Sequence, residues 1–199
     1  MGHADVKTLF DAVAKDYDLQ RRGLIPCFDD FYGMALSLAE SDASSPRILD
    51  LGAGTGLLSG FLWHKYPQAH FTLMDLSENM LEQAKQRFQG KTNFEYVVAD
   101  YTEYPFAESY DIVVSSLSIH HLTHPAKRRL FRAVYGALED GGVFVNADQV
   151  AGNSPRADAY FRKRWLDAIG QSGLAQSAID ASVERRKVDI NARLNDQLA

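Results

Sequence analysis

Three alternating glycines follow directly after an apolar run, and this arrangement strongly limits how the chain can fold. Residues Ile48–Leu51 have strand length, Gly52, Gly54 and Gly56 come next, and a helix-like segment occupies 57–66. Glycine lets the backbone turn sharply and lets a ligand approach backbone atoms that a Cβ would shield. The pattern predicts a strand, a tight turn open to a ligand, and a helix in succession.

Strand-length and helix-length patterns alternate through the middle of the chain. Expected strands are 47–51, 70–75, 94–99, 111–116 and 143–147. Helices are expected between them at 57–66, at 78–88 after an N-cap at Ser77, and at 125–138 beginning with Pro125. Such alternation implies right-handed crossovers and a parallel sheet. We therefore predict an α/β fold built on a doubly wound parallel sheet.

Helical patterns extend the predicted sheet at both ends. They cover residues 5–15, Pro26–Glu40 with Pro26 near the first turn, and a tail that opens at Ser154 and runs to residue 199. The pair Gly141-Gly142 is expected to turn the chain into the last strand. The predicted organisation is one domain over 1–199, with a helical part at 1–45, a core at 46–150 and a helical tail at 151–199.

Composition restricts the classes of protein that remain. The chain has 199 residues, 46% of them hydrophobic and 24% charged, and a net charge of −5, as in an ordinary soluble domain. This charge argues against nonspecific binding of nucleic acid or membranes. No membrane-spanning run or signal peptide is visible, and Cys27 is the one cysteine. We expect a cytoplasmic protein, and the sequence leaves homo-oligomerisation open.

Polar side chains stand where the predicted strands end, which is where open parallel sheets bind ligands. Asp50 suits a ligand with positive charge, and Asp75, 19 residues beyond Gly56, suits the ribose hydroxyls of a nucleoside. Asp100 follows the third strand and could accept an adenine amino group. Helix capping and turn formation are the alternative roles of Asp75 and Asp100. The remaining candidates at these ends are Leu76, Met80, Tyr101 and Ser116.

Five segments together resemble the motifs of class I S-adenosylmethionine (SAM)-dependent methyltransferases in order and spacing. They are Asp50–Gly56, Asp75–Met80, Ala99–Asp100, Tyr110–Ser116 and Leu138–Gly142. The resemblance covers about half of the chain and implies a Rossmann-like fold with SAM as cofactor. It implies that Asp50, Gly52 and Gly54 hold the methionine end of SAM, Asp75 the ribose and Asp100 the adenine. A dinucleotide loop would read G-x-G-x-x-G, whereas Ser59 occupies the last position here.

The two ends of the chain also bear on this resemblance. Residues 10–22 resemble the lid of small-molecule methyltransferases, so Tyr17 with Arg21 or Arg22 is expected to close over the cofactor; an exposed helix end is the alternative. The family usually completes its sheet with an antiparallel hairpin. No strand-like run follows Ala147, so we expect this hairpin to be missing and the tail to be truncated or to cover the sheet edge.

The predicted reaction is in-line transfer of a SAM methyl group to a small-molecule acceptor. His120 and His121 follow the fourth strand, and His120 is the candidate to deprotonate or orient the acceptor, with lining of the pocket as its alternative role. We expect no metal site, because adjacent side chains should diverge.

Other functions remain open. The segment 182–189 distantly resembles carboxy-SAM synthases, in which Arg185 would match an arginine that reaches the carboxyl of the cofactor. The basic residues near Arg162 could instead bind an RNA such as tRNA, although their helical spacing favours an ordinary exposed face. A noncatalytic SAM-binding module and an NAD-dependent oxidoreductase complete the alternatives.

Overall fold

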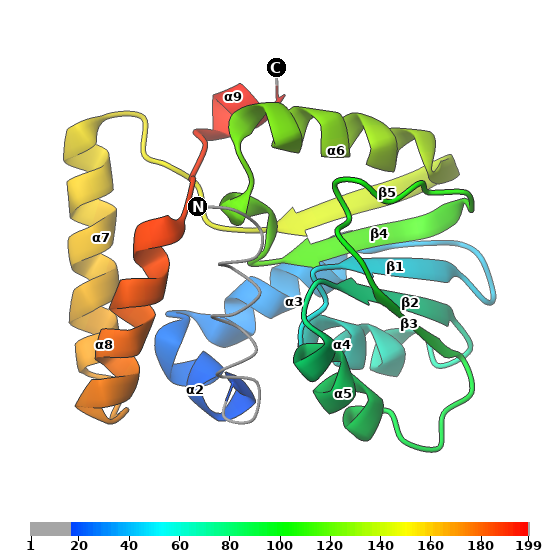
Figure 1. Ribbon diagram of the computed structural model, residues 1–199, viewed down its shortest axis with the longest axis horizontal. Coiled ribbons are helices and arrows are strands. Elements are labelled where there is room, and N and C mark those ends of the chain that lie inside the picture. The colour runs from blue at the N-terminus through cyan, green and yellow to red at the C-terminus, as the bar shows by residue number, and fades with distance from the viewer. Residues whose placement is uncertain (1–16, 199) are drawn as a thin grey trace.

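The protein contains one five-stranded parallel sheet with helices on both faces. The computed structural model describes residues 17–198 (Figure 1). The strand order is β3-β2-β1-β4-β5, and every neighbouring pair is parallel. The chain therefore builds outward from β1 in one direction and then crosses to β4 on the other side. This reversal creates a switch point between β1 and β4, as predicted for a doubly wound sheet.

The strands begin and end close to their predicted positions, with one clear exception. They are β1 (Arg47–Leu51), β2 (His70–Asp75), β3 (Phe94–Val98), β4 (Tyr110–Ser116) and β5 (Leu138–Ala147). The prediction for β5 was wrong at its start, because Gly141-Gly142 lies inside the strand instead of before it. Gly141 has a φ of 81°, and the pairing of β4 with β5 shifts register between Tyr110 and Ile112. The glycine pair thus forms an irregularity within the strand.

Three helices connect the strands as the sequence predicts. They are α4 (Leu57–Lys65), α5 (Glu78–Arg87) and α6 (His124–Gly136). Ser77 caps α5, since its Oγ accepts a hydrogen bond from Met80 N at 3.1 Å. Thr123 caps α6 in the same way through Ala126 N at 3.4 Å. The helix α6 therefore starts one residue before the expected Pro125.

Two apolar layers hold these helices on opposite faces of the sheet. On one face, α3 (Phe28–Leu38), α4 and α5 contribute Tyr32, Leu62 and Leu81 to a core with strand residues Ile48 and Phe71. On the other face, α6 buries Ala126, Leu130 and Val134 against Leu49, Met74 and Val113. Strands covered on both sides account for the nearly continuous apolar runs in the sequence.

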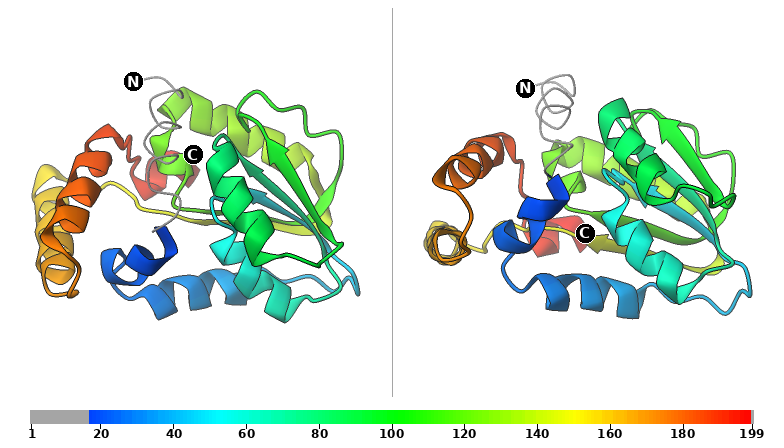
Figure 2. Two further views of the ribbon diagram at one scale, coloured as in Figure 1. Left: turned by 60° about the horizontal axis from the view of Figure 1, so that its bottom comes forward. Right: turned by 90° about the horizontal axis from the view of Figure 1, so that it is seen from below.

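The remaining helices form a layer at the carboxyl end of the sheet. They are α2 (Tyr17–Leu24), α7 (Pro155–Gly170), α8 (Gln176–Arg185), a 3-10 turn (Arg186–Val188) and α9 (Leu194–Leu198). Leu24, Ile169 and Ile179 form a small third core that joins α2, α7 and α8. Figures 1 and 2 show α7 and α8 standing beyond α2, apart from the sheet.

Several boundaries at the ends of the chain differ from the sequence prediction. The helix expected from Pro26 begins at Phe28, because Cys27 before it has left-handed geometry with a φ of 57°. The expected continuous tail is broken after α7, where Gly173 has a φ of 78°. The helix expected at 5–15 lies outside the described residues. Within residues 17–198, β5 pairs with β4 alone, and no helix is long and apolar enough to cross a membrane.

Candidate functional site

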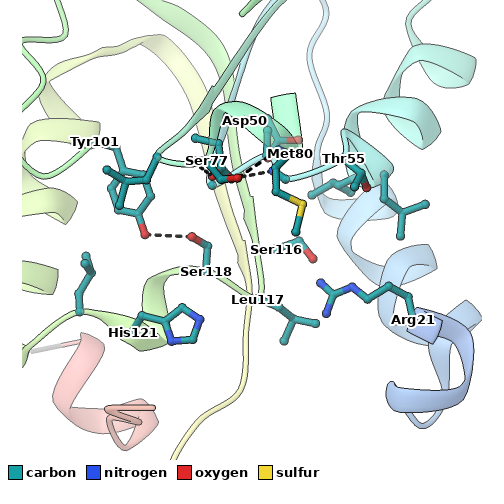
Figure 3. A pocket seen from close by; sticks show the side chains of 18 of the residues that line it. Arg21, Asp50, Thr55, Ser77, Met80, Tyr101, Ser116, Leu117, Ser118 and His121 are labelled. Atoms are coloured by element: carbon teal, nitrogen blue, oxygen red, sulfur yellow. Dashed lines mark hydrogen bonds between the residues drawn. The ribbon is translucent and has the colours of Figure 1, made fainter. Parts of the chain in front are cut away.

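A pocket opens at the carboxyl ends of the central strands, beside the switch point. The loop after β1, the ends of β2, β3 and β4, and the helices α2 and α3 contribute to its wall (Figure 3). Of the residues that the sequence singled out, it is lined by Arg21, Asp50, Gly52, Gly54, Asp75, Leu76, Met80, Asp100, Tyr101, Ser116 and His121. Residues from four strand ends thus converge on one site.

The glycine loop is required by both backbone geometry and space. Gly52 and Gly54 have φ values of 69° and 55°, a region that favours glycine. A Cβ on Gly52 would lie 1.9 Å from Ser118 Oγ, whereas a Cβ on Gly54 would meet no atom within 4 Å. Gly52 therefore permits close packing, and Gly54 leaves room at the pocket wall.

Asp50 is a buried carboxyl group beneath this loop. Asp50 is 1% exposed, and its Oδ2 accepts a hydrogen bond from Ser59 Oγ at 2.6 Å. Burial raises the pKa of Asp50 to about 7, with a smaller contribution from Asp75, while the Ser59 hydrogen bond opposes the shift. A cation placed nearby would favour the ionised form of Asp50.

Asp75 connects β2 to the glycine loop. Its Oδ2 accepts from Gly54 N at 2.8 Å, and its Oδ1 accepts from Ser77 N at 2.8 Å. Asp100, at the end of β3, accepts hydrogen bonds from the backbone and hydroxyl of Thr102 at 2.9 and 2.7 Å. Both carboxylates are thus oriented by the backbone that surrounds the pocket.

Tyr101 forms the neighbouring part of the wall. Its hydroxyl is 2.9 Å from Ser118 Oγ, and Ser118 is the side chain that requires a glycine at position 52. Burial raises the pKa of Tyr101 above its ordinary value, so the hydroxyl stays protonated at neutral pH. Ser116 also lines the pocket, and its Oγ donates to the buried Tyr32 hydroxyl at 3.4 Å.

The two arginines of α2 lie in different environments. Arg21 lines the pocket and extends toward Leu117 (Figure 3). Arg22 points outward: its guanidinium is 2.6 Å from Asp29 Oδ2 and stacks over Phe28. The sequence left Arg21 and Arg22 open for the cofactor, with Arg22 among the candidate binding residues, and the structure brings Arg21 and not Arg22 to the pocket. The side chain of Tyr17 lies outside the part of the chain that the structure describes.

The adjacent histidines also differ. His120 is 7% exposed, and its Nδ1 lies 2.6 Å from Asp148 Oδ1. Its Nε2 lies 3.4 Å from Asp189 Oδ1, which is also 3.3 Å from His121 Nδ1. The rings do not diverge as expected, since their centroids are 4.0 Å apart. His121 reaches the pocket (Figure 3), whereas His120 does not line it.

Nearby carboxylates and burial give His120 and His121 different protonation states. Burial alone would lower the pKa of His120, but Asp148 and Asp189 together raise it to about 9. Burial lowers the pKa of His121, and Asp189 only partly opposes this. At neutral pH, His120 is therefore a cation held between two carboxylates, and His121 is a neutral imidazole. The ligand atoms of both histidines and Asp189 lie within 4.8 Å of one another, a spacing that could also hold a metal ion.

A second cavity adjoins the pocket on the side of the helical tail. Arg21, Leu117 and His121 line both spaces. Leu117 has a φ of 51°, an uncommon conformation for leucine, at the boundary between the two cavities. The walls of the second cavity come from α2, from the segment after β5 and from the tail, including Trp165, Arg186 and Asp189.

Some wall residues could not be found from the sequence. Tyr32, Leu117 and Ser118 carry no motif, and their positions depend on how α3 and the turn after β4 approach the glycine loop. Asp189 contacts the histidines from a segment nearly seventy positions later in the chain. The sequence could have indicated that Arg21 and Arg22 lie in different environments, because side chains at neighbouring positions of a helix point about 100° apart.

Comparison with known proteins agrees with this architecture. Residues 48–142 match a family model described as a methyltransferase domain. A ubiquinone/menaquinone biosynthesis C-methyltransferase from Desulfotalea psychrophila is 31% identical over 144 residues, which cover 72% of this chain and 57% of that protein. A carboxy-S-adenosyl-L-methionine synthase from Helicobacter hepaticus is 25% identical, over 88% of this chain and 76% of the relative.

A solved DhpI-SAM-HEP complex has the same fold. It superposes with a TM-score of 0.62 at 22% identity, covering 77% of this chain and 68% of that one. The chain spans little more than half the length of the Desulfotalea relative. The motif order, the strand order and these matches show that residues 48–142 are similar to the methyltransferase domain of class I SAM-dependent methyltransferases.

Proposed function

We propose that the protein transfers the methyl group of SAM to a small-molecule acceptor bound in the adjoining cavity. The observation that carries this proposal is the convergence of the glycine loop and three strand-end acids on a pocket that shares part of its wall with a second cavity. Two neighbouring spaces with a common boundary suit a cofactor and an acceptor that must meet.

The side chains of the pocket fit SAM in their chemistry. Asp75 offers a carboxylate to the ribose hydroxyls, and Asp100 offers an acceptor for the adenine amino group. Asp50 lies near the open space above Gly54 and suits the cationic methionine end, with Arg21 available for its carboxylate. Leu76 and Met80 supply apolar surface for adenine, and Tyr101 and Ser116 complete the wall.

The residues of the site have a limited chemical task. When bound, SAM supplies a sulfonium methyl that is already activated, so proximity and orientation provide most of the acceleration. An acceptor that arrives protonated also needs a base. His121 meets this need better than His120, since it lines both cavities, is neutral at neutral pH and lies beside Asp189. His120, already a cation, acts by holding Asp148 and Asp189 in position.

The cofactor assignment is tested by measuring S-adenosylhomocysteine (SAH) binding to the Asp75→Asn variant. We expect this change to weaken binding by about 1.5–3 kcal/mol, the usual scale for hydrogen bonds to a charged group. Asparagine keeps one oxygen that can accept from Gly54 N, but its amide nitrogen cannot accept from Ser77 N. Circular dichroism therefore checks that the variant folds. Asp167→Asn, on the exposed face of α7, is the control. Calorimetry that finds equal SAH affinity in both variants, or tighter binding of NADH than of SAH, would overturn the assignment.

A carboxy-SAM synthase activity is the second candidate. The Helicobacter relative matches 88% of this chain, a range that extends beyond the methyltransferase domain into the helical tail. The two activities yield different products. Mass spectrometry of the cofactor after incubation with cell extract should find SAH for a methyltransferase and a carboxylated SAM for a synthase.

A further inference from the structure

The second cavity combines an apolar wall with positive charge. Leu24, Ile25 and Val150 line it together with the rings of Phe161 and Trp165. Trp165 is fixed by a hydrogen bond from its Nε1 to Leu24 O at 3.0 Å. This bond holds α7 against α2, so the apolar wall is a built part of the fold.

The two carboxylates that line this cavity, Asp148 and Asp189, accept hydrogen bonds from other residues of its wall. Asp148 accepts from the His120 ring at 2.6 Å and from the backbone of His120 and Gln149 at 2.8 and 2.9 Å. Asp189 lies between the rings of His120 and His121 and also accepts from the Gln149 side chain. The His120 cation balances one of these two carboxylates, and the other keeps its negative charge within the wall.

The basic side chains outnumber the acids. Arg21, Arg185 and Arg186 line the cavity, and their three positive charges exceed the one carboxylate charge that His120 does not balance. Arg186 lies 4.5 Å from the centre of the Trp165 ring, so a planar guanidinium and an aromatic face meet at one place. Burial lowers the pKa of Arg186, although Asp189 opposes this, and an arginine remains charged in either case. Partial burial strengthens its attraction for an anion.

We propose that the second cavity binds a methyl acceptor with an apolar body and an anionic group, a carboxylate or a phosphate, which pairs with Arg186. This inference rests on the proposed function. The anion would lie toward the tail, where a guanidinium can hold two oxygens of a carboxylate or phosphate. The opposite end of the acceptor then lies at Arg21, Leu117 and His121, the residues shared with the cofactor pocket.

The proposal is tested by calorimetry on the full chain saturated with SAH. The probes are benzoate, phenyl phosphate and the uncharged analogue benzamide. We expect at least one anion to bind about tenfold or more tightly than benzamide, as a charged hydrogen bond should give. Tighter binding of phenyl phosphate than of benzoate would identify phosphate as the preferred group, and the reverse order would identify carboxylate.

Two matched variants locate the anion. Arg186→Gln should remove the preference for the anion and leave benzamide binding unchanged, while Arg186→Lys should keep part of the preference. Arg164→Gln, an exposed position of α7 that does not line the cavity, should behave like the unaltered protein. Circular dichroism checks that the variants fold.

The experiment distinguishes a wrong acceptor class from a wrong cofactor, because anion binding and SAH binding are measured separately. Equal affinity for benzoate, phenyl phosphate and benzamide, no binding of any probe, or an unchanged preference in Arg186→Gln would overturn the anionic acceptor, provided that SAH still binds. A finding that the unaltered protein does not bind SAH would instead overturn the proposed function.

Discussion

At the scale of the residue, Gly52 and Gly54 are glycines of one loop for different reasons: backbone conformation at both positions, and lack of space for a Cβ at position 52. Both have positive φ, but a Cβ would meet Ser118 Oγ at 1.9 Å only at position 52. We expect Gly52→Ala to lower the free energy of unfolding by about 2 kcal/mol or more, and Gly54→Ala by about 1 kcal/mol. Urea unfolding of both variants measures the difference. An equal loss would mean that backbone strain alone, without steric exclusion, requires glycine at position 52.

Another prediction at the residue scale concerns the charge on His120. Its pKa is about 6.5 in an unfolded chain and is raised to about 9 in the folded protein. Folding therefore favours the protonated ring, and the stabilisation is complete below pH 6.5 and is lost as the pH rises through 9. We expect the free energy of unfolding to fall by about 1–3 kcal/mol over this interval.

Substitution separates this effect from other titrations. In His120→Gln the fall between pH 6.5 and 9.5 should largely disappear, whereas His64→Gln, an exposed position of α4, should retain it. Urea unfolding at a series of pH values provides the comparison. A profile of His120→Gln that parallels that of the unaltered protein would show that the ion pairs with Asp148 and Asp189 do not stabilise the fold.

At the scale of the element, α2 connects the cofactor pocket to the helical tail. Asp18 accepts from Thr55 Oγ1 at 2.6 Å and pairs with Arg87, which fastens α2 to the core. Arg21 lines both cavities from the same helix. We expect SAH to slow hydrogen exchange of the α2 amides, because contacts with bound ligand must break before this helix opens.

The exchange measurement includes its own reference. The helix α6 contributes no residue to the cofactor pocket, so its amides should exchange at the same rate with and without SAH. Asp18→Asn should speed exchange of α2 in the free protein, since it weakens both contacts of that carboxylate. If SAH leaves α2 unchanged, this helix is permanent structure, and the predicted lid function does not belong to it.

At the scale of the whole molecule, net charge separates a small acceptor from RNA. The chain carries 26 acidic and 21 basic side chains, and its cofactor pocket is rich in aspartate. We expect no micromolar binding of unfractionated tRNA at moderate salt. RNA binding would weaken with salt by roughly 0.7 log units per log unit for each phosphate neutralised on a single strand. Filter binding with such a slope, lost in the double variant Arg162→Glu/Arg164→Glu, would contradict the small-molecule acceptor.

The sequence by itself determined the central architecture. Apolar runs of strand length alternate with helical periods, and both patterns are local, so the parallel sheet and the helices α4, α5 and α6 could be predicted. Ser77 marked the start of α5 correctly because capping depends on the next few residues alone. The glycines and the strand-end acids Asp50, Asp75 and Asp100 follow from the same local order, although their roles toward SAM stay predictions.

Only the tertiary structure decided which side chains meet. The orientation of α2 brought Arg21 and not Arg22 to the pocket. The 3-10 turn Ile119–His121 after β4 directs His121 toward the pocket, while His120 lies between two acids. Asp189 joins that cluster from the helical tail. The second cavity forms because α7 and α8 pack against α2, with contacts that include Leu24 and Trp165. Such contacts depend on the angles between distant elements, which a periodic pattern along the chain does not encode.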